Sequence, residues 1–488
     1  MPVVNDPRAW SPMRKNITLL LISSGALIAG FAANIQNPAI QDMEASLPAT
    51  SSQISLSISL FILVQGSAPL LWSAISEVKG RRFVYLVSML IFFGGSVGVA
   101  VCKSIGAVIG LRIVQAAGSS AVIAIGAATL ADVYEPSERG TKMGIYYMAP
   151  ALGPSLGPIF GGVLTNAWNW RAPFWFLAIL SGTIFTGFVL FFRDTFRKER
   201  SSAYQALLKD RLKHLEKDTK DVKDHAPTEA AKEEPISAEK DVEKQTTPVA
   251  DVVINDPSLK MGLKDVTPLK PIWLVLRRLN NFLMLFASGL IFALCFTVPY
   301  TSSRTLGTKY GYNSLNIGLV LLAFGIGNMV GSIFGGRWSD IILHRQRAKN
   351  GGKMYPEMRL YSTLYFLIPF PISTIGMGWV LQQHVHVAAV CVLLFITGFI
   401  VISVYTSTIA YIVDANVGRS STAVALNSFF RGMGAFIAVE VAVPIQDSIG
   451  DGWMYTIFGV VLILGNICIL LTLKRGHGWR VKAESTEK

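Results

Sequence analysis

The stretch Ser73-Ala-Ile-Ser-Glu77-Val-Lys-Gly80-Arg81-Arg82 follows an apolar block in the first half of the chain, and Gly336-Arg337-Trp338-Ser339-Asp340 follows another in the second half. In each copy a small residue precedes the acid by four positions, and a basic residue, Arg82 or Arg345, follows it by five. Any loop on the cytosolic side of a membrane attracts basic residues, but that tendency does not produce matched spacing. The match therefore predicts two related halves arranged as parallel repeats.

Apolar blocks extend outward from these two loops along most of the chain. Hydrophobic residues make up 51% of the 488 residues and charged residues only 15%, which is more apolar surface than soluble domains bury. Each block is about twenty residues long, enough for an α-helix to cross ~30 Å of hydrocarbon. The predicted fold is an all-α membrane protein with twelve transmembrane helices in two six-helix halves. The expected spans are 17–40, 54–75, 83–101, 105–130, 143–164, 172–192, 280–302, 315–335, 360–381, 387–412, 421–445 and 454–473.

The segment between the two sets of spans differs in kind from them. It is crowded with Lys, Glu and Asp and has few large apolar residues, so it cannot bury enough surface to fold. A flexible charged linker is therefore expected there. The predicted organisation is a lead (1–16), an N-terminal half (17–192), this linker (193–277), a C-terminal half (278–473) and a tail (474–488).

The orientation in the membrane follows from the basic residues of the short loops. Lys79, Arg81 and Arg82 lie between the second and third spans, and Lys474 and Arg475 follow the last span. The alternate loops are poor in Lys and Arg, and residues 41–53 have none. Both termini and the linker are therefore expected to be cytosolic.

Several other classes of protein are excluded by what the chain lacks. The net charge of +13 is spread between apolar blocks and forms no basic stripe with stacking aromatics, so no nucleic-acid partner is expected. The four cysteines share no Cys-x-x-Cys spacing, and the six histidines form no His-x-x-x-His pair. With no phosphate-binding Gly-x-x-x-x-Gly-Lys motif either, the expectation is a non-enzyme without metal or cofactor.

Three more motifs join the first loop in a specific order. Span one ends in Ala33-Asn-Ile-Gln-Asn-Pro38-Ala39, span four carries Arg112-Ile-Val-Gln115-Ala-Ala-Gly118, and span five carries Gly153-Pro154-Ser-Leu-Gly157-Pro158-Ile-Phe-Gly161-Gly162. With these, the chain resembles the major facilitator superfamily, and within it the twelve-span drug:proton antiporters of fungi. The first loop matches the family's Gly-x-x-x-Asp-Arg-x-Gly-Arg-Arg signature with Ser73 for Gly and Glu77 for Asp.

The resemblance implies a monomer in the plasma membrane that exports a drug, organic acid or secondary metabolite across the lipid bilayer by alternating access. It also implies protons as the coupling ion, yet the acid that many such antiporters carry in span one is replaced here by Asn34, Gln36 and Asn37. Import of a sugar or carboxylate is the alternative function. Residues 192–197 are closer to the Pro-Glu-Thr-Leu-Arg of exporters than to the Pro-Glu-Ser-Pro-Arg of sugar porters.

Small residues of span five form two neighbouring ridges. Gly153, Gly157 and Gly161 recur every four residues and make one smooth ridge, beside which Pro154 and Pro158 remove two backbone donors. Smooth ridges let helices approach closely in lipid. The prolines permit bending where the two halves rock against each other; a plain packing face is the alternative.

Two arginines lie well inside predicted spans, one in each half. Placing the charged Arg112 inside span four costs about 2.5–3.5 kcal/mol, so its side chain should face a cavity or a partner. Gln115 lies on the same helical face. The alternative is that Arg112 extends to the outer interface of the membrane. Arg431 lies one turn from Asn427 in span eleven. We predict that the two arginines form the polar, anion-sensitive centre of the path.

Other polar residues inside the spans leave two interpretations open. Asn34, Tyr405 and Tyr411 suit a substrate path or only hydrogen bonds between helices. Glu440 is either a proton carrier or a residue at the outer headgroups. Two further acids, Asp132 and Asp414, are expected in cytosolic ion-pair networks with Glu138, Arg139 and Arg419.

Overall fold

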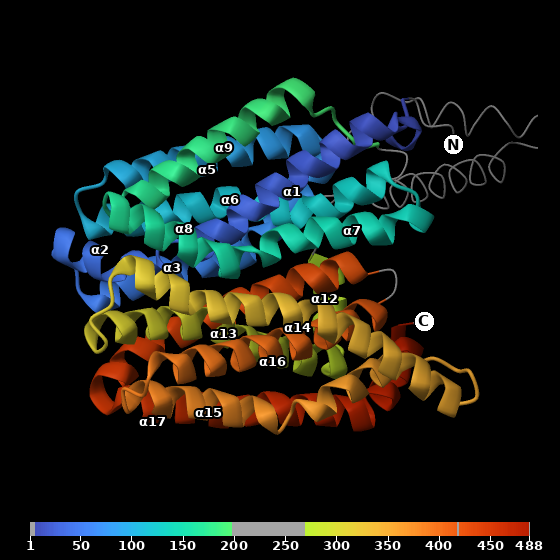
Figure 1. Ribbon diagram of the computed structural model, residues 1–488. Helices are drawn as coiled ribbons and strands as arrows, with labels where there is room; N and C mark the ends of the chain where they lie inside the picture. The colour runs from blue at the N-terminus through green and yellow to red at the C-terminus, as the bar shows by residue number, and fades with distance from the viewer. Residues whose placement is uncertain (1–4, 198–268, 417–418, 488) are drawn as a thin grey trace, which may run out of the picture.

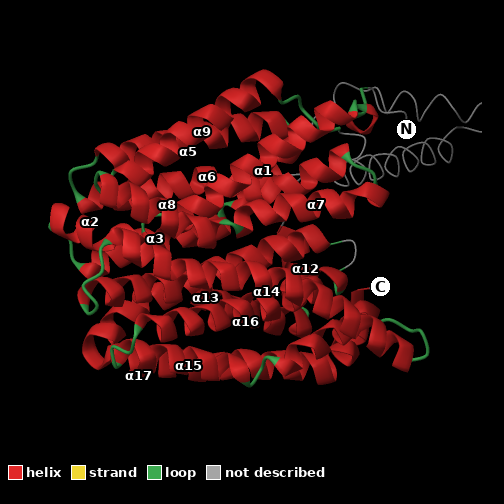
Figure 2. Ribbon diagram, in the orientation of Figure 1, coloured by secondary structure: helices red, strands yellow, loops and turns green. Residues whose placement is uncertain are grey.

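The computed structural model describes residues 5–197, 269–416 and 419–487, and these contain helices and loops but no strand. Two bundles of roughly antiparallel helices lie side by side, one from each half of the chain (Figure 1). Loops between the helices are short (Figure 2). The N-terminus and the C-terminus lie at the same end of the molecule, called here the terminal end; the other is the opposite end. The expected all-α fold in two halves is confirmed.

The helices of the N-terminal half are interrupted where prolines fall. Pro69 begins a new helix within predicted span two, and span five is broken between Pro150 and Pro154, because proline lacks the backbone donor that would continue a helix. The elements are η1 (Pro7–Ala9), α1 (Pro12–Asn34), η2 (Asn37–Ala39), α2 (Ile40–Ser46), α3 (Ser51–Ser67), α4 (Pro69–Lys79), α5 (Arg81–Val101), α6 (Ile105–Val133), α7 (Pro136–Ala151), α8 (Gly153–Ala167) and α9 (Ala172–Phe191).

A short helix, α12 (Leu269–Leu276), lies at the end of the predicted linker (193–277), just before the C-terminal half, whereas a flexible segment was expected there; residues 198–268 of that linker lie outside the described residues. The elements of the C-terminal half are α13 (Leu279–Thr308), α14 (Ser314–Lys349), the 3-10 helix η5 (Pro356–Tyr365), α15 (Pro369–Gln382), α16 (Val387–Asp414) and α17 (Ser420–Glu487). Gly450 has a φ of +83° and breaks α17 between predicted spans eleven and twelve. The last leg of α17 continues as a helix through most of the predicted tail, which the sequence did not indicate.

Most of the predicted spans correspond to single long helices. Among the described residues, nine helices are long and apolar enough to cross a membrane, or ten if η5 and α15, which meet at 42°, count as one span. One of the nine, α17, carries two predicted spans. Predicted span five is divided between α7 and α8, each too short to qualify alone.

The two halves meet along a seam made by two pairs of helices. Gly66 of α3 contacts Gly432 of α17, and Gly162 of α8 contacts Ser314 at the start of α14. Glycine at such positions lets backbones approach where a side chain would collide.

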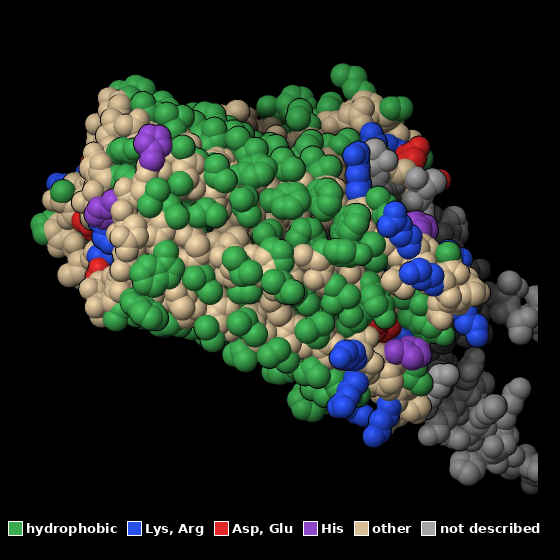
Figure 3. Space-filling view, turned by 60° about the horizontal axis from the view of Figure 1, so that its bottom comes forward, with side chains coloured by type: hydrophobic (Ala, Val, Ile, Leu, Met, Phe, Trp, Pro, Cys, Tyr) green, Lys and Arg blue, Asp and Glu red, His purple; other side chains and the backbone are tan. Residues whose placement is uncertain are grey.

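The outer surface has the pattern of a membrane protein. Figure 3 shows apolar side chains across the middle of one face and the larger groups of Lys and Arg toward the terminal end. This distribution agrees with the loop asymmetry of the sequence.

Candidate substrate path and proton site

Arg112 of α6 is completely buried inside the N-terminal half. Its Nη1 donates to the backbone oxygen of Ala32 at 2.9 Å and to Oε1 of Gln115 at 2.6 Å, and its guanidinium lies 3.9 Å from the ring centre of Phe61. Gln115 in turn donates to Ser96 at 2.7 Å. Arg112 therefore has partners on three helices, as the insertion cost required, and does not snorkel.

Arg431 of α17 has a different environment, because it is only partly buried. Its Nη1 donates to the Tyr405 hydroxyl at 2.8 Å, and its guanidinium lies 3.6 Å from the ring centre of Phe292. Asn427 donates to the same hydroxyl at 3.1 Å. A guanidinium has five N–H donors, and among the described residues Arg431 uses one of them in a hydrogen bond. Its Nε is buried without a partner among the described residues, and so are Nε and Nη2 of Arg112, so the two arginines differ in exposure and not in having unused donors.

The two arginines are not joined by any hydrogen bond, ion pair or ring contact between described residues. Arg112 is enclosed by helices of its own half, whereas Arg431 lies beside α13 and α16 of the other. Arg431 is therefore the more exposed of the two arginines. Arg112 holds α1, α3 and α6 together.

Two other predicted path residues have structural partners in this conformation. Asn34 donates to the backbone oxygen of Gly30 at 3.3 Å, within α1. Tyr411 is fully buried near the terminal end, where its hydroxyl accepts a hydrogen bond from Asn280 at 3.0 Å. Tyr405 and Tyr411 therefore belong to different clusters, although they lie on one helix.

Glu440 bridges the two halves. Its Oε1 accepts hydrogen bonds from Ser59 at 2.5 Å and Ser55 at 3.1 Å, and both serines lie on α3 of the N-terminal half. The Glu440 side chain thus lies at the seam between the two halves. A carboxylate held by hydroxyl donors loses acceptor strength when it is protonated, so its protonation would weaken this contact between the halves.

Further hydrogen bonds join the halves at the opposite end. Ser314 donates to Asp42 at 2.7 Å, Arg304 donates to Ser51 at 3.1 Å, and Ser303 donates to the backbone oxygen of Asn37. Their donors come from α13 and α14 and their acceptors from η2, α2 and α3. The described contacts therefore close the two halves against each other at this end.

The two ridges of span five face different neighbours. On the glycine ridge, Gly153 packs on Gly30 of α1, Gly157 packs near Asn34, and Gly161 packs on the backbone of Ile35. On the proline side, Pro158 contacts Gly318 of α14, across the seam, while Pro154 opens α8 beside the break. The glycine ridge is thus a contact inside one half, and the neighbouring ridge is the contact between halves.

The first loop motif forms a polar network at the terminal end. Arg81 is buried; its backbone N–H donates to Asp194 at 3.1 Å and its Nε donates to Asp132 at 3.4 Å. Gly80 has a φ of +88°, and a side chain there would collide with Asp194. Arg82 donates to the backbone oxygen of Val189 at 2.9 Å. Glu77 is half-buried one turn before these residues.

The second copy of the motif uses an arginine that the spacing did not identify. Arg359 of η5 pairs with Asp340 at 2.8 Å and with Asp414 at 2.5 Å. Arg345, which the matched spacing selected, is exposed and forms no ion pair within the described parts of the chain. Arg81 with Asp132 and Arg359 with Asp414 are equivalent pairs, since each acid ends the fourth span of its half. Arg81 and Arg359 were not among the partners expected for these two acids.

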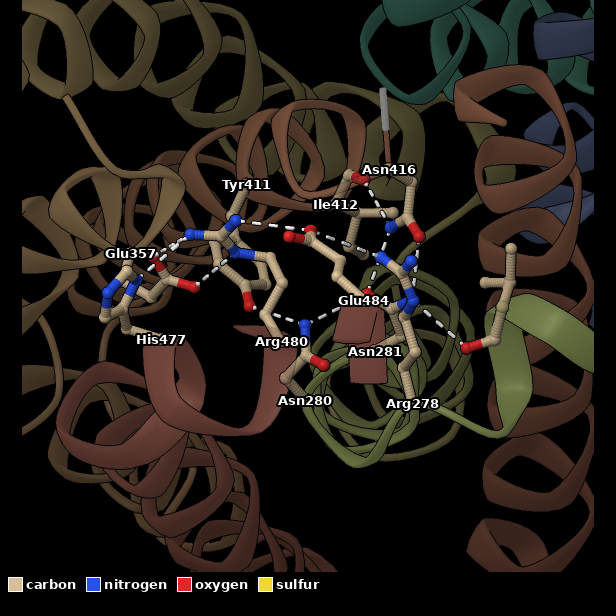
Figure 4. A network of polar contacts seen from close by, with 11 residues as sticks. Arg278, Asn280, Asn281, Glu357, Tyr411, Ile412, Asn416, His477, Arg480 and Glu484 are labelled. Carbon is tan, nitrogen blue, oxygen red and sulfur yellow. Dashed lines mark hydrogen bonds and ion pairs between the residues drawn. The ribbon is translucent and has the colours of Figure 1, made fainter. Parts of the chain in front are cut away.

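A second network at the terminal end was also missed (Figure 4). Glu357, which is only 5% exposed, accepts from Arg480 of the last leg of α17 at 3.2 Å. On the same leg, Glu484 pairs with Arg278 at 3.8 Å. The helical tail therefore packs against the N-terminal end of α13 and against η5. The charges at 480 and 484, one turn apart, were the only signal of it in the sequence.

The matches to known proteins agree with this arrangement. The model of the Major Facilitator Superfamily matches residues 22–439. Quinidine resistance protein 3 of Saccharomyces cerevisiae is 25% identical over 98% of this chain and 85% of its own length. Citrate exporter 1 of Aspergillus niger is 25% identical over 96% of this chain and 87% of its own.

A solved structure supports the fold alone. The crystal structure of a POT family transporter in complex with 5-aminolevulinic acid superposes with a TM-score of 0.64 at 13% identity, and covers 94% of this chain and 96% of that one. With the family model spanning most of the sequence and the two-half helical fold in place, the chain is a membrane transporter that belongs to the Major Facilitator Superfamily.

Proposed function

We propose that this transporter exports a small organic anion, such as a di- or tricarboxylate, from the cytosol in exchange for protons. The observation that carries the proposal is the environment of Arg431, which is partly exposed. Its guanidinium donates one hydrogen bond, to the Tyr405 hydroxyl, and forms no ion pair with an acid among the described residues. A planar guanidinium with free donors matches a carboxylate. The citrate exporter among the relatives supports this class of substrate.

Tyr405, Asn427 and Phe292 complete the proposed binding site. The Tyr405 hydroxyl accepts from both Arg431 and Asn427, so it fixes their orientation. Phe292 covers one face of the guanidinium and shields it from water, which strengthens its interaction with an anion. Asn427 keeps a buried side-chain oxygen without a described partner, which a hydroxyl on the substrate would satisfy.

Glu440 is the proposed proton carrier. When it is deprotonated, Ser55 and Ser59 hold the opposite end closed. Protonation from outside is expected to release the serines and permit opening, and the proton then leaves on the cytosolic side after the halves rock. Many related antiporters carry an acid in span one, which this chain lacks. The assignment gives Glu440 the proton-coupling role in its place and adds a role in closing the opposite end.

The corresponding prediction is that Glu440→Gln uncouples transport from protons. In proteoliposomes with an acidic lumen, the variant should lose gradient-driven substrate uptake but keep exchange of labelled for unlabelled substrate. Glutamine is uncharged, like protonated Glu440, so it should hold the two serines only weakly and let the opposite end open, but it cannot bind or release a proton. Asp447→Asn, an exposed acid on the same helix that pairs with Arg304, is the control and should remain coupled. Gradient-driven uptake by Glu440→Gln at the wild-type rate would remove Glu440 from the coupling mechanism.

The proposed setting is the plasma membrane, with a monomer whose terminal end and linker are cytosolic. The charge distribution of the loops supports this orientation. An epitope tag at the C-terminus, and another in the linker at residue 230, should be labelled only after cells are permeabilised. Labelling of either tag on intact cells would reverse the orientation, and with it the direction of transport proposed here.

A further inference from the structure

A groove lies between α14 and η5 near the terminal end of the C-terminal half. It has a volume of about 330 Å³ and is lined by Ile342 and Gln346 of α14 and by Tyr361, Leu364 and Tyr365 of η5. All three η5 residues are exposed, Tyr365 to 63%. The proposed transport mechanism gives no role to this groove, which lies on the outside of the bundle.

An aromatic wall extends from the groove along α14. The ring of Trp338 lies 5.4 Å from that of Tyr365 and stacks on Phe334 at 5.8 Å. Trp338 is held by a hydrogen bond from its ring nitrogen to the backbone oxygen of Ser362 at 3.3 Å. Phe334 is 41% exposed. The wall thus runs from the level of the loops, where aromatic residues gather at membrane interfaces, into the apolar part of the surface.

Two basic residues lie on α14 close to the residues that line the groove. Arg345 and Lys349 each follow a lining residue, Ile342 or Gln346, by three positions, so they lie on the same side of α14. Both are exposed and form no ion pair within the described ranges.

The nearby acids do not neutralise these two cations. Asp340 is engaged by Arg359 at 2.8 Å, and Glu357 is engaged by Arg480 at 3.2 Å. The groove therefore combines uncompensated positive charge close to it with an apolar floor that leads toward the bilayer.

We propose that this groove binds one anionic phospholipid of the leaflet at the terminal end. The headgroup phosphate lies between Arg345 and Lys349, and an acyl chain follows Tyr365, Trp338 and Phe334. A free phosphate would make no use of the aromatic wall. The phosphate of a neutral lipid such as phosphatidylcholine is already balanced by the lipid's own ammonium group, so a net anionic headgroup gains more from the two cations. Basic pockets beside transmembrane helices recognise anionic headgroups in this way.

The test uses the purified full-length transporter, stripped of lipid in detergent and titrated with phosphatidylserine or phosphatidylcholine while bound lipid is counted by native mass spectrometry. Arg345→Ala combined with Lys349→Ala should weaken phosphatidylserine binding about thirty-fold, or about 2 kcal/mol, since each basic residue near an anionic surface contributes about 1 kcal/mol. Lys474→Ala with Arg475→Ala removes the same charge from exposed positions on α17 and should bind like the wild type.

Two further measurements test whether the bound anion is a lipid or free phosphate, and whether the aromatic wall contributes to binding. Tyr365→Ala should also weaken phosphatidylserine binding, and inorganic phosphate should not displace the lipid. The proposal is overturned if the Arg345 and Lys349 double variant binds phosphatidylserine like the wild type, or if the control variant loses binding equally. Equal binding of phosphatidylcholine by the wild type, displacement by phosphate, or an unaffected Tyr365→Ala would overturn it as well.

Discussion

Replacing Gly162 by leucine is expected to lower transport roughly ten- to hundred-fold while both halves still fold and insert. A Cβ at this position would lie 2.5 Å from the backbone oxygen of Ser314 in the other half. Overpacking of this kind costs about 1–3 kcal/mol, and here the cost falls only on the state in which the halves are closed at the opposite end. The transporter would then be held away from that state and would stop cycling.

Two other glycines serve as controls for the Gly162→Leu result. Gly94→Leu, on α5, enters open space and should transport normally. Gly161→Leu meets Ile35 of its own half, so it should reduce the amount of folded protein as well as transport. The measurements are transport rate per inserted molecule and the melting temperature in detergent. A Gly162→Leu variant that transports at the wild-type rate would show that the seam between α8 and α14 does not need to close.

Arg431→Ala is expected to raise the KM for a carboxylate substrate by about ten- to hundred-fold, because a hydrogen bond to a charged group contributes about 1.5–3 kcal/mol. The KM for a neutral substrate should change little. Arg431→Lys keeps the charge but loses the planar fork and should fall between the alanine variant and the wild type. Initial rates of uptake into inverted vesicles, normalised to the amount of transporter, give these values.

Arg112→Ala is the matched comparison for Arg431→Ala. Arg112 is fully buried and bonded to Ala32 and Gln115, so its loss leaves buried acceptors unpaired, which is a cost to folding. We expect less folded transporter and a normal KM in the molecules that remain. If Arg112→Ala raises the KM for the anion selectively and Arg431→Ala does not, the binding site belongs to the N-terminal half.

The sequence predicted the features that depend on composition and local spacing. Blocks of apolar residues determine the spans, and the repeated loop around Glu77 and Asp340 indicates two halves. The cost of burying Arg112 required a partner, and the structure supplies one in Gln115, three residues along the same helix. Each of these predictions uses residues that are close together in the chain, where helical geometry fixes which side chains share a face.

The contacts that the sequence did not reveal join residues far apart in the chain. Glu440 meets Ser55 and Ser59 because α17 crosses α3 at the seam, and no periodicity within either helix records that crossing. The pairing of Arg359 with Asp340 was likewise missed, because the matched spacing pointed to Arg345. Tyr411 and Tyr405 looked equivalent from their positions on one helix, yet the distant Asn280 and Arg431 place them in different clusters.

Proton-driven export of an organic anion is tested most directly with the wild-type transporter in inverted vesicles that carry a pH-sensitive dye. With an acidic lumen, labelled citrate should accumulate inside while the lumen becomes more alkaline in step with it, and a protonophore should abolish both signals. Citrate uptake that is the same with and without the pH gradient, and leaves the lumen pH unchanged, would contradict the account.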